Sequence, residues 1–203
     1  FKDHLGNDIT TPYINVQNAS NPATQASIVW MDQQALIDGL SVTNDGNKSF
    51  VNFHVSAANI KNGNAVIAVK SADGTIMWSW HLWFDHSDAL STIESTNHDG
   101  NKFKFTKNIL GYTLYKWQAT SYESARAARM KIEQELGNGE KKTAYITITQ
   151  TPYAERIYST TFYQFGRKDA FPGVDVDKLY GGTIVKNAGD NMSIKNSIQN
   201  PEK

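Results

Sequence analysis

Alternation of apolar and polar positions predicts β-strands along most of this chain. In SFVNFHV, Val51, Phe53 and Val55 fall on one face and Asn52 and His54 on the other, which is the period of a half-buried strand. Other strand candidates are SIVW, KFKF, YTLYKWQAT and RIYSTTFYQF. The runs NAVIAVK and TIMWSWHLWF are separated only by SADG, so we expect a β-hairpin there.

The second run of this hairpin raises a question of function, because it holds three of the five tryptophans. Strand periodicity gives it one wholly apolar face, made of Ile76, Trp78, Trp80, Leu82 and Phe84. We predict that this face is core and that Trp78 and Trp80 are buried, not a sugar-binding platform. The opposite face holds Met77, Ser79, His81 and Trp83. This face is better suited to ligand binding than the apolar one. We nevertheless expect another layer of the protein or a partner to cover it.

Two interpretations compete for SYESARAARMKIEQELGNG. Helix formers, a Ser121 N-cap and Gly137 as a C-terminal cap favour a helix over residues 121–136. RMKIEQ also alternates, however, and in the following TAYITITQ Ala144, Ile146 and Ile148 alternate with polar or aromatic residues. We predict a β-hairpin across residues 129–150.

These patterns predict a mostly-β protein, a β-sandwich of immunoglobulin-like or transthyretin-like type, in one or more domains with long loops. We expect a sandwich domain over residues 1–120 with a loop-rich N-terminal segment. A hairpin-containing continuation or second small β unit should cover residues 121–173. Residues 174–203 are rich in Gly, Asn and Asp and are expected to be loops at the start of a further, truncated domain.

Composition and charge narrow the classes of function. Over 203 residues, 20 basic side chains balance 20 acidic ones, which disfavours a nucleic-acid groove or an anionic membrane surface. The chain has no cysteine, so thiolate chemistry and disulfides are excluded. No apolar run approaches the length of a membrane span, and FKDHLGND is unlike a signal peptide.

Candidate chemistry is sparse. His81, Asp85, His86, Asp88, His98 and Asp99 can ligate metals, but their spacing matches no compact site, and we expect neither a metal nor another cofactor. GNGEKKT lacks the Gly-Lys-Ser/Thr sequence that a phosphate-binding loop requires. No nucleophile elbow or pair of carboxylates stands out elsewhere. In FYQFGRKDAFPG, Arg167, Lys168 and Asp169 are predicted to cap carbonyls and pair charges, in preference to holding a ligand. We predict no catalytic residues.

Four segments carry a family resemblance. FKDHLGNDITTPYI, GNAVIAVKSADGTIMWSWHLWF, FYQFGRKDAFPG and NSIQNP, in this order, resemble the fimbrillin-like cell-surface proteins of Bacteroidetes, particularly tip-type or adhesin-like fimbrial subunits. The resemblance implies an exported β-sandwich protein, lipid-anchored or assembled at the outer membrane, that binds other fimbrial subunits or cell-surface proteins. It implies no catalytic residues. Relatives carry a lipoprotein leader and further chain beyond NSIQNP, so both ends are expected to be fragment ends.

Three functions follow as hypotheses. The first is a non-enzymatic fimbrial subunit or adhesin, with no nucleic-acid partner and no membrane span in this part of the chain. The second is a carbohydrate-binding module of a surface glycan-utilisation protein, for which His81, Trp83, Tyr115 and Trp117 are the candidate ligand-binding residues. The third is a surface glycan-processing enzyme, which requires two carboxylates facing across a cleft.

Overall fold

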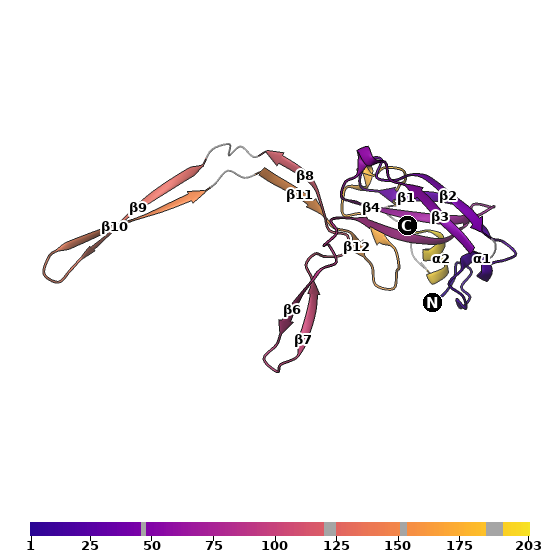
Figure 1. Cartoon of the computed structure of the whole chain (residues 1–203), viewed down its shortest axis with the longest axis horizontal. Coiled ribbons are helices and arrows are strands. Elements are labelled where there is room, and N and C mark those ends of the chain that lie inside the picture. Colours follow the sequence, from indigo (N-terminus) through magenta and orange to yellow (C-terminus); the bar gives the residue numbers. More distant parts are fainter. Residues whose placement is uncertain (46–47, 120–124, 151–153, 186–192) are drawn as a thin grey trace. The chain divides into compact units, whose positions relative to one another are not determined.

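The computed structural model describes residues 1–45, 48–119, 125–150, 154–185 and 193–203, and only the backbone of residues 114–119 and 154–158. The protein is mostly β, with antiparallel sheets in a sandwich-like arrangement, as the sequence predicted (Figure 1). The elements in chain order are α1 (Ile14–Gln17), β1 (Ala23–Met31), β2 (Asp38–Asp45), β3 (Lys48–His54), η1 (Ala57–Asn59), β4 (Gly63–Ser71), β5 (Ile76–Phe84), β6 (Thr92–Thr96), β7 (Lys102–Thr106), β8 (Thr113–Ala119), β9 (Arg126–Glu135), β10 (Lys141–Gln150), β11 (Ala154–Ser159), β12 (Phe162–Tyr163), β13 (Ala170–Phe171), η2 (Val176–Lys178) and α2 (Ile194–Gln199).

The chain forms two compact units, which are residues 1–115 with 158–203, and residues 116–157. The described residues of 174–203 belong to the first unit. Tyr180 exchanges two main-chain hydrogen bonds of 2.9 Å with Met31. Leu179 and Ile184 pack against the first unit's core. Few apolar residues at irregular spacing suffice to dock this segment, which is why no sequence period revealed it.

The first unit is built on a three-stranded antiparallel sheet in the order β1-β4-β5. Its central strand β4 is buried along almost its whole length, with only Lys70 partly accessible. A strand covered on both faces requires a nearly continuous apolar run, and NAVIAV provides it. The predicted hairpin is therefore confirmed, with β4 paired to β5 from Gly63–Phe84 to Lys70–Ile76.

One face of this sheet packs against the two-stranded sheet of β2 and β3. Ala65 and Ile67 of β4 form a core with Met31, Leu36 and Ile37. Partly buried side chains from the central sheet and from the β2–β3 region pack against it: Ile28, Leu40, Val51, Val55, Leu82 and Phe84. Of the face expected for β3, Val51 and Val55 pack inward, whereas Phe53 is exposed. Because β3 is an edge strand of a two-stranded sheet, no neighbouring layer among the described residues covers Phe53 near its end.

The opposite face of the central sheet is covered by the segment around β13. Val29, Trp30, Val66 and Ala68 pack there against Ala170. Trp30 is 0% exposed, and its indole Nε1 donates a 3.2 Å hydrogen bond to the carbonyl of Ala170. The indole thus ties two segments 140 residues apart and satisfies its polar group inside the core.

The prediction that Trp78 and Trp80 are both buried is wrong for Trp80, which is 36% exposed, while Trp78 is half-buried. The register of β4 and β5 shifts between Val69 and Lys70. Met77, assigned from periodicity to the other face, is 1% exposed and joins Ala23 and Val69 in the core. A bulge changes which side chains share a face, and strict alternation could not anticipate it.

In the second unit, β9 and β10 form the predicted hairpin, with ten residue pairs and no register shift. The helix that local propensity favoured for this stretch does not form over Arg126–Glu135. Every residue of both strands is exposed, so Ile146 and Ile148 do not line a half-buried face as their alternation suggested. Tertiary neighbours, which the sequence pattern cannot show, decide whether an apolar stripe is covered.

A second exposed hairpin, formed by β6 and β7, belongs to the first unit. All the residues of both strands are exposed. Ile93 lies opposite Phe105, and Ser95 lies opposite Phe103, so Ile93, Phe103 and Phe105 share one face. The other face carries Lys102, Lys104 and Glu94, with an ion pair of 3.0 Å between Lys102 and Glu94.

Candidate functional site

His81, a candidate ligand-binding residue, lies half-buried in β5 at the centre of a polar chain. Its Nε2 is 2.9 Å from Oδ1 of Asn64, and its Nδ1 is 2.7 Å from the hydroxyl of Tyr163. Its ring lies 6.4 Å from the Trp30 ring and 6.0 Å from the Tyr163 ring, centroid to centroid. Both ring nitrogens already have protein partners, so His81 positions neighbours and offers little to a ligand.

The protonation of His81 follows from its partners. The amide nitrogen of Asn64 donates to Asp32 and to the Gly111 carbonyl, which leaves Oδ1 of Asn64 as an acceptor for the His81 Nε2–H. Nδ1 then accepts from Tyr163. Burial lowers the pKa of His81 to about 4, against an opposing effect of Asp169, so the ring is neutral at neutral pH.

The polar chain ends inward at Asp32, which is buried. Its Oδ1 accepts a 2.7 Å hydrogen bond from the main-chain N–H of Asn64, and its Oδ2 a 3.0 Å bond from the Asn64 amide. Burial raises the pKa of Asp32, although the hydrogen bonds from Asn64 act in the opposite direction. Asp32, Asn64, His81 and Tyr163 therefore form a continuous chain of hydrogen bonds from the core to the surface.

Trp83, a second candidate ligand-binding residue, also has a protein partner. Trp83 is half-buried, and its Nε1 donates a 2.9 Å hydrogen bond to the carbonyl of Tyr112. The side chains of Tyr115 and Trp117 lie outside the described residues. Trp83 thus fixes the segment before β8, and its indole is anchored by that bond.

The Arg167–Lys168–Asp169 triplet caps carbonyls and pairs charges, as predicted from the sequence. Arg167 donates to the carbonyls of Asn200, Pro201 and Lys203, capping the turn after α2. Its side chain also lies over the Phe171 ring, 4.4 Å from the centroid. The guanidinium therefore binds the C-terminal segment to the core through its several donors.

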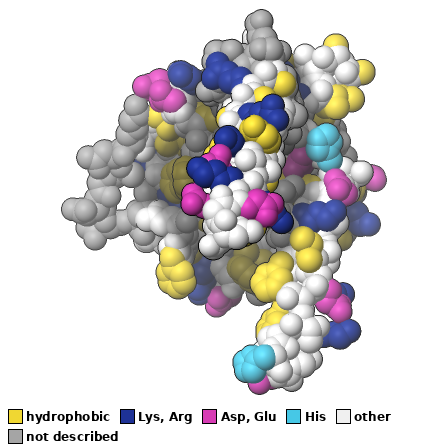
Figure 2. All heavy atoms as spheres, turned by 90° about the vertical axis from the view of Figure 1, so that its left-hand side faces the viewer, with side chains coloured by type: hydrophobic (Ala, Val, Ile, Leu, Met, Phe, Trp, Pro, Cys, Tyr) yellow, Lys and Arg dark blue, Asp and Glu magenta, His cyan; other side chains and the backbone are white. Residues whose placement is uncertain are grey.

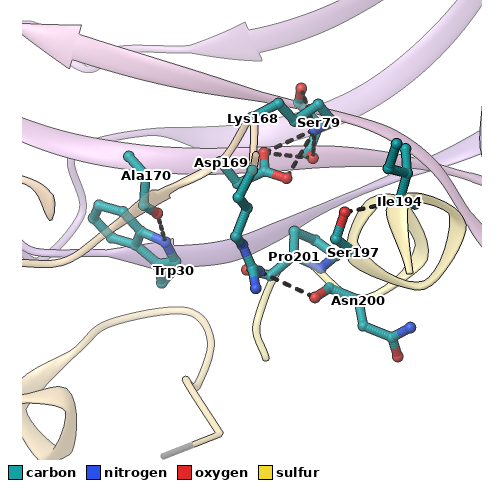
Figure 3. Close-up of polar contacts among 10 residues, drawn as sticks. Trp30, Ser79, Lys168, Asp169, Ala170, Ile194, Ser197, Asn200 and Pro201 are labelled. Carbon is teal, nitrogen blue, oxygen red and sulfur yellow. Dashed lines mark hydrogen bonds and ion pairs between the residues drawn. The ribbon is translucent and has the colours of Figure 1, made fainter. Parts of the chain in front are cut away.

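Lys168 and Asp169 close on Ser79 of β5, as Figure 3 shows. The Lys168 ammonium lies 2.8 and 2.9 Å from the two Asp169 oxygens, and it also contacts Ser79 Oγ. Burial lowers the pKa of Lys168, whereas Asp169 acts to raise it. A serine beside a lysine can form a nucleophilic pair, but here Ser79 Oγ is buried and donates to Asp169. The geometry fits a structural ion pair.

Exposed aromatic side chains gather elsewhere, around a small cavity between α1, β3 and β5. Tyr13, Phe50 and Trp80 are exposed and line this cavity of about 90 Å³. Asn15 lies beside them and donates to Ser49 Oγ at 2.7 Å and to the Ala23 carbonyl at 3.2 Å. Aromatic planes next to fixed polar groups are what a sugar ring or an apolar side chain requires.

Two larger hollows also lie in the first unit. One of about 550 Å³ is lined by Lys70, Asp73 and Glu202 among others, and one of about 450 Å³ by Trp78, Arg167 and Ile194 among others. Arg167 and Lys168, which line the second hollow, are engaged as described above, and Lys2 pairs with Asp8 at 2.9 Å. Within the described ranges, no group of three His, Asp or Glu side chains could hold a metal ion. Over the same ranges, no helix is long and apolar enough to cross a bilayer.

Comparison with protein-family models, curated proteins and solved structures finds no significant match to this chain.

Sequence reasoning missed the inner half of the polar chain and the aromatic cluster. Asn64 interrupts the apolar run of β4, and a polar residue in a buried strand signals a hydrogen-bonded network. Tyr13, Phe50 and Trp80 come from three separate segments. No local pattern could have brought them together.

Proposed function

We propose that the chain is a non-enzymatic cell-surface binding protein, a fimbrial subunit or adhesin that holds other subunits or surface ligands. The observation that carries the proposal is the β6–β7 hairpin, which exposes Ile93, Phe103 and Phe105 on one face. Exposed apolar patches on an otherwise well-packed protein are typical of interaction sites. The resemblance of FYQFGRKDAFPG and the other segments to fimbrillin-like proteins supports the same function.

In this proposal, partners bind by main-chain pairing and by apolar contact. A strand that adds to an open sheet edge gains hydrogen bonds along its length, while alternate side chains enter pockets. Phe103 and Phe105 lie two residues apart on one strand, with ring centroids 6.4 Å apart, so a single apolar segment could contact both.

The test of this proposal compares the two faces of β7. Labelled chain is added to intact cells that carry the gene, and bound chain is measured against concentration. Phe103→Ser with Phe105→Ser should remove most saturable binding, whereas Lys102→Ser with Lys104→Ser, on the opposite face of the same strand, should retain it. Equal binding by both variants would contradict a role for the aromatic face. Antibody labelling of intact cells tests the proposed surface location.

Catalysis is tested separately. Surface polysaccharides are incubated with the chain, and new reducing ends are counted. Release above the background of a heat-denatured sample would overturn the non-enzymatic proposal. Saturable binding without cleavage would agree with it.

The alternative is a carbohydrate-binding module, and the exposed cluster of Tyr13, Phe50 and Trp80 favours it. Immobilised surface polysaccharides serve as the probe. Trp80→Ala should cost about 1 to 3 kcal/mol of affinity if sugar stacking resembles base stacking on aromatic side chains. Phe53→Ala is the matched control, since Phe53 is exposed but does not line the cavity. The subunit proposal instead expects no polysaccharide binding that depends on Trp80.

A further inference from the structure

The β9 strand presents a long, regular and open edge. It pairs with β10 through ten residue pairs without a bulge, and among the described residues no strand pairs with its other edge. Residues 126–135 contain no proline. Natural edge strands are usually blocked by prolines, bulges, short length or charged side chains. Of these features β9 has only the charged side chains, and they are of both signs. A two-stranded hairpin alone is also marginally stable, and additional strands stabilise it.

The main chain shows which residues of β9 face this open edge. The N–H of Leu136 donates a 2.8 Å hydrogen bond to the Glu140 carbonyl, so Leu136 points its main-chain groups toward β10. In an antiparallel pair this direction alternates from residue to residue. The odd-numbered residues of β9 therefore direct their N–H and C=O groups outward.

The side chains of these outward residues change from positive to negative charge along the strand. Arg129 and Lys131 come first, and Glu133 and Glu135 follow. All four are on one face, because strand side chains alternate with a period of two. Within a single copy, Lys131 lies 2.8 Å from Glu133, and Lys141 lies 3.2 Å from Glu133. A strand that is basic in its first half and acidic in its second is complementary to itself when reversed.

We propose that two copies of the chain pair through β9, antiparallel, with Ile132 of each copy at the two-fold axis. Lys131 then lies opposite Glu133 of the other copy, and Arg129 lies opposite Glu135. The symmetry repeats each pair, so every outward residue from Arg129 to Glu135 faces an opposite charge. Opposite charges directly across a strand pair are stabilising, and a two-fold contact of one patch with itself closes the assembly.

This register is selected against its neighbours. A slip of one residue would place charged side chains opposite apolar ones, because it moves them to the other face. A slip of two residues places Lys131 opposite Lys131 in one direction and Glu133 opposite Glu133 in the other. Like charges directly opposite are destabilising. Only the register centred on Ile132 pairs all four outward charges from Arg129 to Glu135.

The other face agrees with the same register. Ile132 meets Ile132, Met130 meets Gln134, and Ala128 meets Leu136 of the other copy. The two hairpins become one four-stranded sheet in the order β10-β9-β9-β10. This inference goes beyond the proposed function, since it requires no receptor and no other subunit.

The edge of β10 does not offer the same complementarity. Lys141–Gln150 contains two lysines and no acidic residue, so a β10–β10 contact gains no charge pair. Figure 2 shows acidic and basic side chains close together on the face that it presents, and Lys131, Glu133 and Lys141 form ion pairs on the β9–β10 hairpin. Because one edge contact buries little surface, the association should be weak and reversible.

The experiment is a charge exchange, followed by sedimentation over a series of protein concentrations. The wild-type chain should pass from its monomer mass of 22.6 kDa toward twice that value. Glu133→Lys with Glu135→Lys makes β9 wholly basic, and Arg129→Glu with Lys131→Glu makes it wholly acidic. Each variant alone should self-associate about tenfold more weakly or worse, and their mixture should restore a dimer.

Proline variants test the edge itself without depending on charge. Lys131→Pro removes an outward N–H of β9, and Thr147→Pro removes the corresponding outward N–H of β10, so each spares the β9–β10 ladder. Lys131→Pro should abolish the dimer, and Thr147→Pro should retain it. A wild-type chain that remains monomeric at every concentration would overturn the inference. So would a mixture of the charge variants that forms no dimer, or loss of the dimer in Thr147→Pro alone.

Discussion

The β4–β5 and β9–β10 hairpins have similar lengths and opposite environments. Each is an antiparallel pair with strands of nine or ten residues. Nearly all of β4 is buried, whereas every residue of β9 and β10 is exposed. The first hairpin lies in a sheet with packed layers on both faces. The second pairs with no further strand among the described residues. The number of neighbouring layers, more than hairpin geometry, separates the buried strands of this protein from the exposed ones.

The two hairpins also differ in how their apolar residues are arranged. The β4 run NAVIAV is apolar on both faces, apart from Asn64, and so requires cover on both. In β10, Ala144, Ile146 and Ile148 alternate with Tyr145, Thr147 and Thr149, so one face remains compatible with water. The exposed hairpin therefore does not require a covering layer on that face.

The largest expected effect is on stability, through the core that packs against the β4–β5 hairpin. Trp30→Ala should lower the free energy of unfolding by about 3 to 5 kcal/mol, because it creates a cavity in the core and removes the hydrogen bond to Ala170. Denaturant unfolding followed by circular dichroism measures the loss. The matched control in the exposed hairpin is Tyr145→Ala, which should change stability by less than about 0.5 kcal/mol. Similar losses in both variants would remove the contrast between the two regions.

The next effect concerns the Lys168–Asp169 ion pair, which attaches the segment before β13 to Ser79 of β5. Asp169→Ala should cost about 2 to 3 kcal/mol, since it leaves the Lys168 ammonium largely buried without its carboxylate. The lower part of the usual range applies because the Lys168 side chain remains 24% exposed. The double variant Lys168→Met with Asp169→Leu should recover most of the stability. If the double variant is as unstable as Asp169→Ala, the unpaired charge is not the cause.

The third effect is a dependence on pH that should be confined to the first unit. The folded-state pKa of His81 is lowered to about 4 from 6.5, so the unfolded chain binds more protons between these values. The contribution of neutral His81 is therefore fully present above pH 6.5 and is lost as the pH falls toward 4, by up to about 3 kcal/mol. The wild-type chain and His81→Phe are compared at several pH values. Asp32, whose pKa is raised, acts in both chains and cancels in the difference. Parallel pH profiles would show that His81 does not cause the loss.

The smallest effect belongs to the exposed hairpin. Met130→Thr with Ile146→Thr removes an apolar cross-strand pair from β9 and β10. The free energy of unfolding of the first unit should change by less than about 0.5 kcal/mol, because neither side chain belongs to its core. Hydrogen exchange of β4 amides measures this unit directly. Faster exchange in β4 would mean that the hairpin contributes to the core after all.

The sequence by itself determined the mostly-β class, both hairpins and the structural role of Arg167, Lys168 and Asp169. Continuous or alternating apolar runs and turn residues are local properties, and they selected strands even where helix propensity competed, as at Met130 and Ile132. The candidate site was less accessible to such reasoning. The sequence marked His81 and Trp83 as candidate ligand-binding residues, but Asn64, Tyr112 and Tyr163, which occupy their polar groups, lie far away in the sequence.

Tertiary structure alone decided which apolar faces are covered. A register shift beside Val69 buried Met77, and no period of two contains that information. Trp80 lies in the regular part of the ladder, opposite Ile67, and is nevertheless 36% exposed. The last segment docked through Tyr180, Leu179 and Gln199, although its sequence has no regular pattern. Burial depends on contacts between residues distant in the chain, and single-sequence periodicity reports only the faces that are available to be buried.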